Sequence, residues 1–156
     1  LFLQRGANPE ITYHEDISQP RFEILCDDRQ LGQALINLFQ NAADSVTTRL
    51  LDAQKTDGDI WLSLKEDGDR IIITVADNGL GLPRDIGRDL TDPYVTTRAE
   101  GTGLGLAIVQ KIMEDHGGAL VLEDRPGGGA KVSLIFATKE PNDGSVEKEV
   151  PGISND

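Results

Sequence analysis

The chain of 156 residues has little that would support a disulfide framework or a protein-bound metal cluster. It contains one cysteine, Cys26, and two separate histidines, so paired cysteines and the spacing of zinc ligands are both absent. It also has no run of about 18 apolar residues and no N-terminal signal-peptide pattern. These absences favour a domain that works in the reducing cytoplasm without direct contact with a membrane, although its parent could be membrane-anchored.

Basic residues are scarce: 15 lysines and arginines face 27 aspartates and glutamates, which gives a net charge of −12. Nonspecific binding to nucleic acid or to a membrane surface needs a basic face, so this balance argues against both. A polyphosphate ligand would depend on local positive character from backbone N–H groups, Mg²⁺ or single cations.

The chain divides into a short start, one globular domain and a polar end. Its first residue is leucine, so we expect a piece of a longer chain, with residues 1–8 as the end of an upstream helix or linker. Residues 9–138 have enough apolar content for a single core. Residues 139–156 are rich in Pro, Gly, Ser and acidic residues, and we expect a disordered acidic tail there.

Hydrophobic periodicity predicts two helical segments and several short strands. The first helix starts at an Asp27 cap and keeps an apolar face from Leu31 to Val46, before a polar connection over residues 50–58. The second opens near Leu104 and stops at the glycines after His116. Strands are expected over residues 11–14, 22–26, 60–65, 71–76, 120–123 and 130–137.

The most informative stretch lies between two glycine clusters. A β-branched run over residues 71–75 leads into Asp77-Asn78-Gly79-Leu80-Gly81, where a carboxylate follows a strand and glycines permit close approach of a flat ligand. Gly101-Thr102-Gly103-Leu104-Gly105-Leu106 opens the second helix, whose first N–H groups suit phosphate. We therefore expect a nucleotide site, with its base end at Asp77, its phosphate end at 101–105 and a mobile lid over 82–100.

Two asparagines stand out in the first helix. Asn37 and Asn41 lie four residues apart on one face, with Asp44 continuing the stripe. Asparagine is a poor residue for a helix interior, because its side chain competes for backbone hydrogen bonds. The pair is either a solvated polar face or a set of neutral oxygen ligands for Mg²⁺ and phosphate.

Each glycine cluster taken singly is weak evidence, because a tight turn also explains it. A P-loop needs Gly-Lys-Ser/Thr, which is absent, and the dinucleotide fingerprint needs a third glycine where Arg84 stands. The protein-kinase signature set and the Gly-x-Ser-x-Gly nucleophile elbow are absent too. The order of the motifs therefore carries more information than any one of them.

Four motifs in this order resemble the N, G1, F and G2 boxes of sensor histidine kinases. The resemblance covers roughly residues 9–138, and the stretch over 93–98 with the glycines after it is most similar to the nitrogen-regulation branch. These kinases share a superfamily with the gyrase, heat-shock-ninety and mismatch-repair ATPases. The matching motifs are Asn37-x-x-x-Asn41, Asp77-x-Gly79-x-Gly81, Asp92-Pro93-Tyr94 and Gly101-x-Gly103-x-Gly105.

The resemblance implies an α+β fold, a two-layer α/β sandwich in which about three helices cover one face of a mixed sheet of about five strands, the Bergerat fold. It implies ATP and Mg²⁺ as cofactors. By this analogy Asp77 would accept a hydrogen bond from the adenine amine, Asn41 helped by Asn37 would hold Mg²⁺, and Arg98 would approach the γ-phosphate. The other implied nucleotide contacts are Gly79, Gly81, Leu82, Thr97, Gly101, Thr102, Gly103, Leu104, Gly105 and Leu106.

The chain departs from the kinase pattern in three respects. Asp44 stands where many sensor kinases have a lysine, and Ala130 stands where a threonine often supports adenine through water. Neither histidine lies in the setting of a phosphoacceptor helix, because His14 is on a predicted strand and His116 ends a helix. The fragment is therefore expected to bind ATP without containing its own phosphate acceptor.

Three classes of function remain open. The first is the kinase half-reaction, in which the γ-phosphate passes to a histidine on a separate dimerisation domain and then to a response regulator. The second is a gyrase-like ATPase, whose glutamate general base would stand at position 37, where an asparagine amide cannot accept the proton of water. The third is a degenerate nucleotide-binding scaffold, which Asp44 and Ala130 keep possible.

Overall fold

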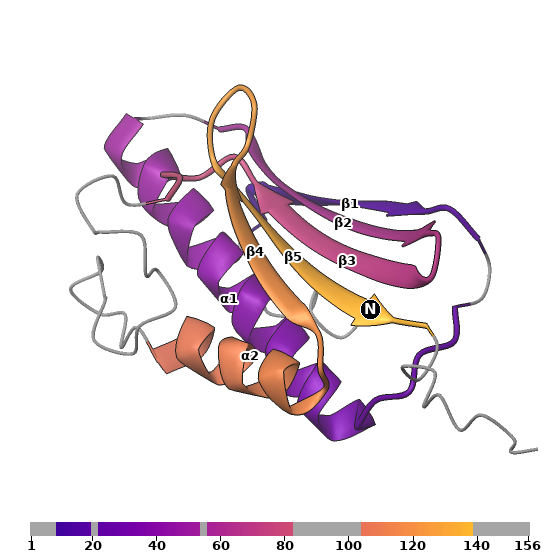
Figure 1. Ribbon diagram of the computed structural model, residues 1–156. Coiled ribbons are helices and arrows are strands. Elements are labelled where there is room, and N and C mark those ends of the chain that lie inside the picture. The colour runs from indigo at the N-terminus through magenta and orange to yellow at the C-terminus, as the bar shows by residue number, and fades with distance from the viewer. Residues whose placement is uncertain (1–8, 20–21, 54–55, 83–103, 139–156) are drawn as a thin grey trace, which may run out of the picture.

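Alternating apolar residues build a five-stranded sheet in the order β1-β2-β3-β5-β4, in a computed structural model that describes residues 9–19, 22–53, 56–82 and 104–138. The β1–β2 pair is parallel and the other three pairs are antiparallel, so the sheet is mixed. Both described helices cover the same face of it (Figure 1). The elements are β1 Ile11–Ile17, α1 Asp28–Ala53, β2 Gly58–Asp67, β3 Arg70–Asp77, α2 Leu104–Asp115, β4 Ala119–Asp124 and β5 Ala130–Ala137.

Helix α1 begins as the sequence predicts. Asp27 caps it, with Oδ1 accepting the backbone N–H groups of Arg29 at 2.9 Å and Gln30 at 3.1 Å. These bonds satisfy donors that a helix start leaves without a partner inside the helix. The predicted apolar face packs under the sheet, with Leu38, Ala42 and Val46 buried in the core.

Helix α2 ends in a glycine cap that also ties it to α1. Gly117 has φ +63°, and Gly118 N–H donates to the Met113 carbonyl at 2.9 Å, which closes the last turn. His116 Nδ1 lies 2.7 Å from the Ile112 carbonyl, while its Nε2 accepts the backbone N–H of Asp27 at 3.0 Å. His116 is therefore a helix-end packing residue, as predicted, and joins the end of α2 to the cap of α1.

The core lies between this face of the sheet and the two helices. Its largest fully buried side chains come from both layers, so neither layer could bury them alone. Burying apolar side chains is the main favourable term in folding. These side chains are Ile60, Met113, Leu134, Val46 and Val109.

Two expectations about elements need correction. Residues 22–26 alternate between half-buried and exposed as a strand would, but they pair with no strand and instead pack Phe22, Ile24 and Cys26 against the core. Helix α1 continues to Ala53, because Leu50 extends the apolar face and is buried. Two helices lie within the described residues, and residues 83–103 lie outside them.

Cys26 is a free, half-buried thiol beside two carboxylates. Burial, together with the carboxylates of Asp28 and Asp27, raises the pKa of the Cys26 thiol, because each disfavours the thiolate. At pH 7.5 the thiol therefore stays more fully protonated than a free cysteine. We expect alkylation of Cys26 by iodoacetamide to be slower than that of a free cysteine and to reach the free rate in urea. Equal rates with and without urea would contradict this protonation state.

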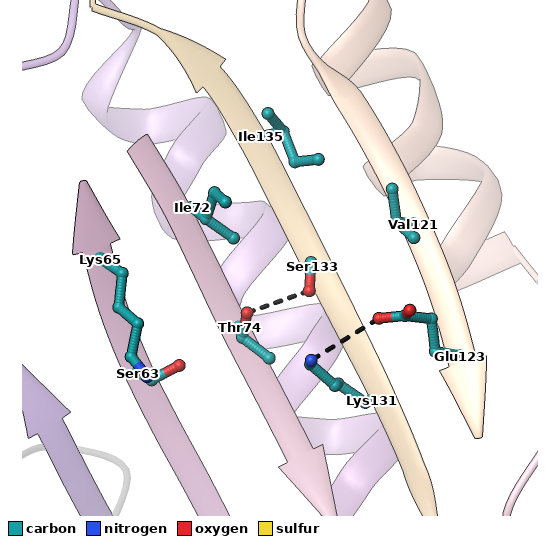
Figure 2. Close-up of a pocket in the computed structure, with 9 residues that line it drawn as sticks. All are labelled: Ser63, Lys65, Ile72, Thr74, Val121, Glu123, Lys131, Ser133 and Ile135. Atoms are coloured by element: carbon teal, nitrogen blue, oxygen red, sulfur yellow. Dashed lines mark hydrogen bonds and ion pairs between the residues drawn. The ribbon is translucent and has the colours of Figure 1, made fainter. Parts of the chain in front are cut away.

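The opposite face of the sheet carries a shallow hollow that is unrelated to the predicted nucleotide site. Figure 2 shows its lining on β2, β3, β4 and β5, with the helices behind the sheet. Thr74 and Ser133 pair at its centre, with their hydroxyl oxygens 3.0 Å apart, and Lys131 lies 3.7 Å from Glu123 at its edge. Side chains alternate between faces along a strand, so this lining points away from the side that carries Asp77.

Within the described ranges, neither helix combines the length and apolarity needed to cross a bilayer.

Candidate functional site

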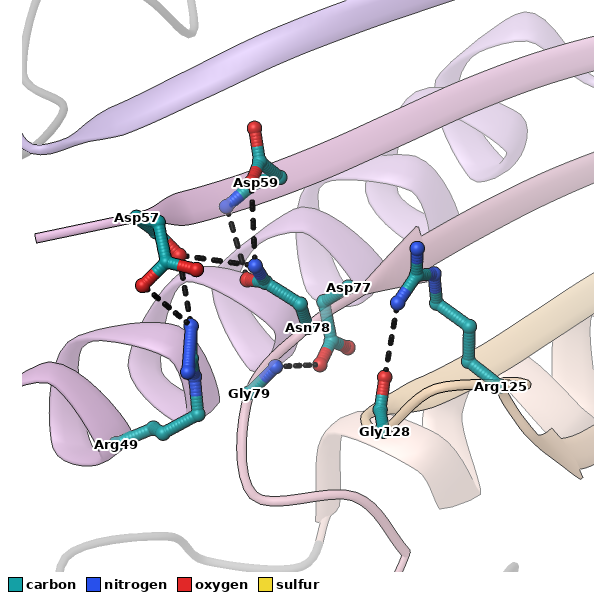
Figure 3. Close-up of polar contacts among 8 residues, drawn as sticks. All are labelled: Arg49, Asp57, Asp59, Asp77, Asn78, Gly79, Arg125 and Gly128. Atoms are coloured by element: carbon teal, nitrogen blue, oxygen red, sulfur yellow. Dashed lines mark hydrogen bonds and ion pairs between the residues drawn. The ribbon is translucent and has the colours of Figure 1, made fainter. Parts of the chain in front are cut away.

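Asp77 is the last residue of the central strand β3, and its side chain is 5% exposed. It shares the helix-facing side of the strand with Ile71, Ile73 and Val75, which are buried at two-residue spacing. A buried carboxylate is costly unless it accepts hydrogen bonds. Its Oδ1 accepts the backbone N–H of Gly79 at 2.8 Å, as Figure 3 shows. An ionised carboxylate offers about four acceptor positions, so Asp77 can accept hydrogen bonds from more than one donor.

The turn after Asp77 is held from three directions. Asn78 N–H donates to the Asp59 carbonyl at 3.2 Å, Gly79 N–H to Asp77, and Leu80 N–H to Ser45 Oγ at 2.9 Å. Each of these three backbone donors thus bonds to a different element: β2, β3 or α1. The conformation of the turn therefore depends on both layers of the fold.

The side chain of Asn78 anchors the segment that precedes β2. Its Oδ1 accepts Asp59 N–H at 2.9 Å, and its Nδ2 donates to the Asp57 carbonyl at 2.9 Å (Figure 3). Arg49 of α1 donates to the same Asp57 carbonyl at 2.7 Å. The end of β3, the start of β2 and the last turns of α1 are thereby joined into one polar network.

Gly79 has no room for a side chain. A Cβ there would lie against Ser45 Oγ, 2.6 Å from the Ser45 carbonyl carbon and 2.7 Å from Val46 N. The turn therefore rests directly on the backbone of α1. Gly81 has φ +83°, a backbone conformation that glycine adopts without strain, and it faces the Gly129 carbonyl in the turn between β4 and β5.

The two predicted asparagines meet the start of α2. A Cβ on Gly105 would lie 3.5 Å from Asn41 Nδ2, and Asn37 Nδ2 lies 3.5 Å from the Gly105 carbonyl. Asn37 Oδ1 also accepts Gln33 Nε2 at 3.0 Å. Asn37 is 9% exposed, so the pair is no solvated polar face but part of the contact between the helices.

Several predicted site residues lie outside the described residues. These are Thr97, Arg98, Gly101, Thr102 and Gly103, together with the lid over 82–100 except its first residue and the Asp92-Pro93-Tyr94 motif. Leu82 is half-buried at the end of the described segment. Leu104 is the first residue of α2, and Leu106 is partly buried and packs against the core.

Ser45, Arg49 and Gly129 belong to the site but are absent from the residues that the sequence predicts. Ser45 and Arg49 continue the Asn37–Asn41 spacing by two further steps of four along α1, a signal that the sequence does contain. Ser45 is buried, whereas Asp44 is exposed. The polar stripe therefore continues into the site through Ser45 rather than Asp44. Gly129 lies against Asp77 because β5 pairs with β3, two strands that are far apart in the sequence.

A family model described as histidine kinase-, DNA gyrase B- and HSP90-like ATPase matches residues 26–140. The chain belongs to this family. Its relatives within this family include proteins named as sensor histidine kinases. Nitrogen regulation protein NtrY of Azorhizobium caulinodans is 40% identical over 152 residues, covering 94% of this chain and 20% of that protein. Sensor histidine kinase ZraS of Salmonella typhi is 39% identical over 135 residues, covering 86% of this chain and 27% of that protein.

Solved histidine kinases share the fold of this ATPase domain. The catalytic domain of histidine kinase ThkA matches with a TM-score of 0.71 at 26% identity, covering 84% of this chain and 82% of that one. Full-length ShkA in complex with AMPPNP matches with a TM-score of 0.65 at 32% identity, covering 83% of this chain and 26% of that one. These matches confirm the predicted α+β sandwich and show the catalytic ATPase domain of the sensor histidine kinase type. The chain spans about a fifth to a quarter of the curated relatives it matches.

Proposed function

We propose that this domain binds Mg²⁺·ATP and donates the γ-phosphate to a histidine on a separate dimerisation domain of a longer cytoplasmic or membrane-anchored sensor kinase, for relay to a response regulator. One observation carries the proposal. Asn41 of α1 lies against the start of α2, and Ser45, one turn further on, holds the turn after Asp77. A helix start suited to phosphate and a buried carboxylate suited to a base therefore meet along one face of α1.

The base end fits adenine. An ionised carboxylate can only accept hydrogen bonds, so Asp77 would pair with the exocyclic amine of adenine and repel the carbonyl of guanine or hypoxanthine. Gly79 puts backbone rather than a side chain beside it. Support comes from ShkA, which is 32% identical and is solved with AMPPNP, an adenine nucleotide.

The phosphate end fits Mg²⁺ and a phosphate chain. Asn41 provides an amide oxygen, a ligand type that Mg²⁺ accepts, and Asn37 positions the start of α2 through Gly105. The first N–H groups of α2 would hold phosphate oxygens, and Arg98 with Thr97 would approach the γ-phosphate. When bound, ATP supplies the phosphoryl group and Mg²⁺ offsets its charge.

The phosphate acceptor must come from elsewhere in the parent protein. His14 lies 2.7 Å from Asp59 and stacks on Trp61, on the face of the sheet that the helices leave open. His116 lies at the far end of α2 from Gly105, which puts it roughly 16 Å along the helix axis. These are the two histidines of the chain, and both are held by structural contacts.

Asn37 argues against steady ATP hydrolysis. Its amide joins Gln33 to the Gly105 carbonyl, at 3.0 Å and 3.5 Å. An amide has no basic site that could take a proton from attacking water, so a general base is lacking at this position. The gyrase-like alternative therefore has no support at the place where its base would stand.

The proposal is tested by phosphoryl transfer. The domain is incubated with Mg²⁺ and ATP labelled at the γ-phosphate, together with a protein supplying the upstream helices of the parent. We expect label on a histidine of that protein, recognised because phosphohistidine is labile in acid and stable in base. No label on any histidine, despite bound ATP, would support the scaffold alternative, and continuous ADP formation by the domain alone would support the hydrolase.

A further inference from the structure

Ser45 is a buried hydroxyl in the middle of a long helix. It is 4% exposed, and serine there is unfavourable for the helix, because its side chain competes with the backbone for hydrogen bonds. Its Oγ accepts Leu80 N–H at 2.9 Å, a bond between two elements 35 residues apart in sequence. A serine that destabilises its own helix but makes a long-range hydrogen bond is best explained by a function of that bond.

The bond fixes the turn at the point where it leaves the sheet. Gly79 packs on the backbone of Ser45 and Val46 without room for a Cβ, so the turn can approach α1 no further. Leu80 itself is 54% exposed, so its side chain contributes little packing to this anchor. The hydroxyl and the close contact together hold the turn at a set distance from the helix.

This turn also orients the carboxylate of Asp77. Gly79 N–H donates to Asp77 Oδ1 at 2.8 Å, so the position of Gly79 contributes to the plane in which the carboxylate is held. We propose that Ser45 is a positioning residue for base recognition: through Leu80 and Gly79 it aims Asp77 at the exocyclic amine of adenine. This inference rests on the proposed nucleotide site and adds a determinant of base selectivity to it.

A base-selectivity role and a structural role predict different results. Without the hydroxyl, Leu80 N–H can bond to water, because the turn lies at the surface. The Asp77 carboxylate then loses the contribution that the fixed turn makes to its orientation. ATP would lose the hydrogen bond from its exocyclic amine to Asp77. Inosine triphosphate has a carbonyl at that position and so has no such bond to lose. We therefore expect Ser45→Ala to reduce the preference for ATP over inosine triphosphate about tenfold, chiefly by weakening ATP binding.

The test measures dissociation constants for both nucleotides, with Mg²⁺, by calorimetry. Thr48→Ala is the matched control, because its hydroxyl lies on the same helix but bonds the Asp44 carbonyl at 2.8 Å. It should leave the preference unchanged. In an Asp77→Asn background, Ser45→Ala should change ATP binding by less than about twofold, because the carboxylate it positions is already gone. Should Ser45→Ala fail to fold, Ser45→Cys makes the same comparison, since a thiol is a weak acceptor of similar shape.

The outcomes separate the two proposals. The positioning role would be overturned if Ser45→Ala weakened the binding of both nucleotides equally, or weakened the binding of neither. The proposed function would still stand in that case, provided that the wild-type domain binds ATP. The positioning role would also be overturned if the effects of Ser45→Ala and Asp77→Asn on ATP binding were additive in the double variant. Failure of the wild-type domain to bind ATP would overturn both.

Discussion

Replacing Asp77 by asparagine should weaken Mg²⁺·ATP binding about 10- to 100-fold, which corresponds to the loss of one hydrogen bond to a charged acceptor. The amide has the same shape and keeps an oxygen for Gly79 N–H, so the turn is expected to persist. What changes is that the charged acceptor facing the adenine amine is replaced by a group that can also donate. The variant should therefore bind inosine triphosphate relatively better than the wild type does.

Calorimetry with both nucleotides measures this effect, and urea unfolding confirms that the variant is folded. Asp57→Asn is the matched control at the same end of the sheet, because its carboxylate is 71% exposed and its shortest contacts use the backbone carbonyl. ATP binding that is unchanged in Asp77→Asn would remove this carboxylate from the site.

The second large effect concerns the turn between β4 and β5. Gly129→Ala should destabilise the domain by about 4 kcal/mol or more and abolish ATP binding. A Cβ at position 129 would collide with the Asp77 carbonyl oxygen and lie 2.8 Å from Asn78 Cα. Its φ of +97° adds strain of about 1–3 kcal/mol for any residue with a side chain.

Gly128→Ala separates strain from collision. Gly128 has φ +112°, but a Cβ there would meet nothing within 4 Å. It should therefore cost about 1–3 kcal/mol and leave ATP binding in place. Urea unfolding of both variants gives the comparison, and equal costs would mean that contact with Asp77 does not explain the glycine at position 129.

The sequence predicts the parts of the site that depend on local spacing. Asp77 after a β-branched run, and Asn37 with Asn41 at one helical turn, are signals carried by a few neighbouring residues. Their meeting with Gly105 at the start of α2 follows from the order of the motifs and is seen in the structure. Nucleotide contacts by these residues remain predictions, which the binding experiments test.

The parts that could not be predicted depend on pairing between distant segments. Residues 22–26 have the alternation of a strand, but alternation alone cannot show whether a partner strand exists. The predicted end of α1 comes too early for a similar reason. Polar residues around Leu50 interrupt the apolar pattern, and only the structure shows that Leu50 is buried. Gly129 looks like one of three turn glycines, and its contact with Asp77 arises only when β5 pairs with β3.

That contact has a consequence for the order in which the domain is made. The base end of the site is closed by Gly129, which is synthesised 52 positions after Asp77, and by β5, which lies between β3 and β4 in the sheet. A nascent chain that has exposed α1, β2, β3 and α2 would still lack β5, the strand that pairs with β3 and brings Gly129 to Asp77. Nucleotide binding during translation should therefore begin only after β5 has left the ribosome, so the incomplete kinase domain would not sequester ATP.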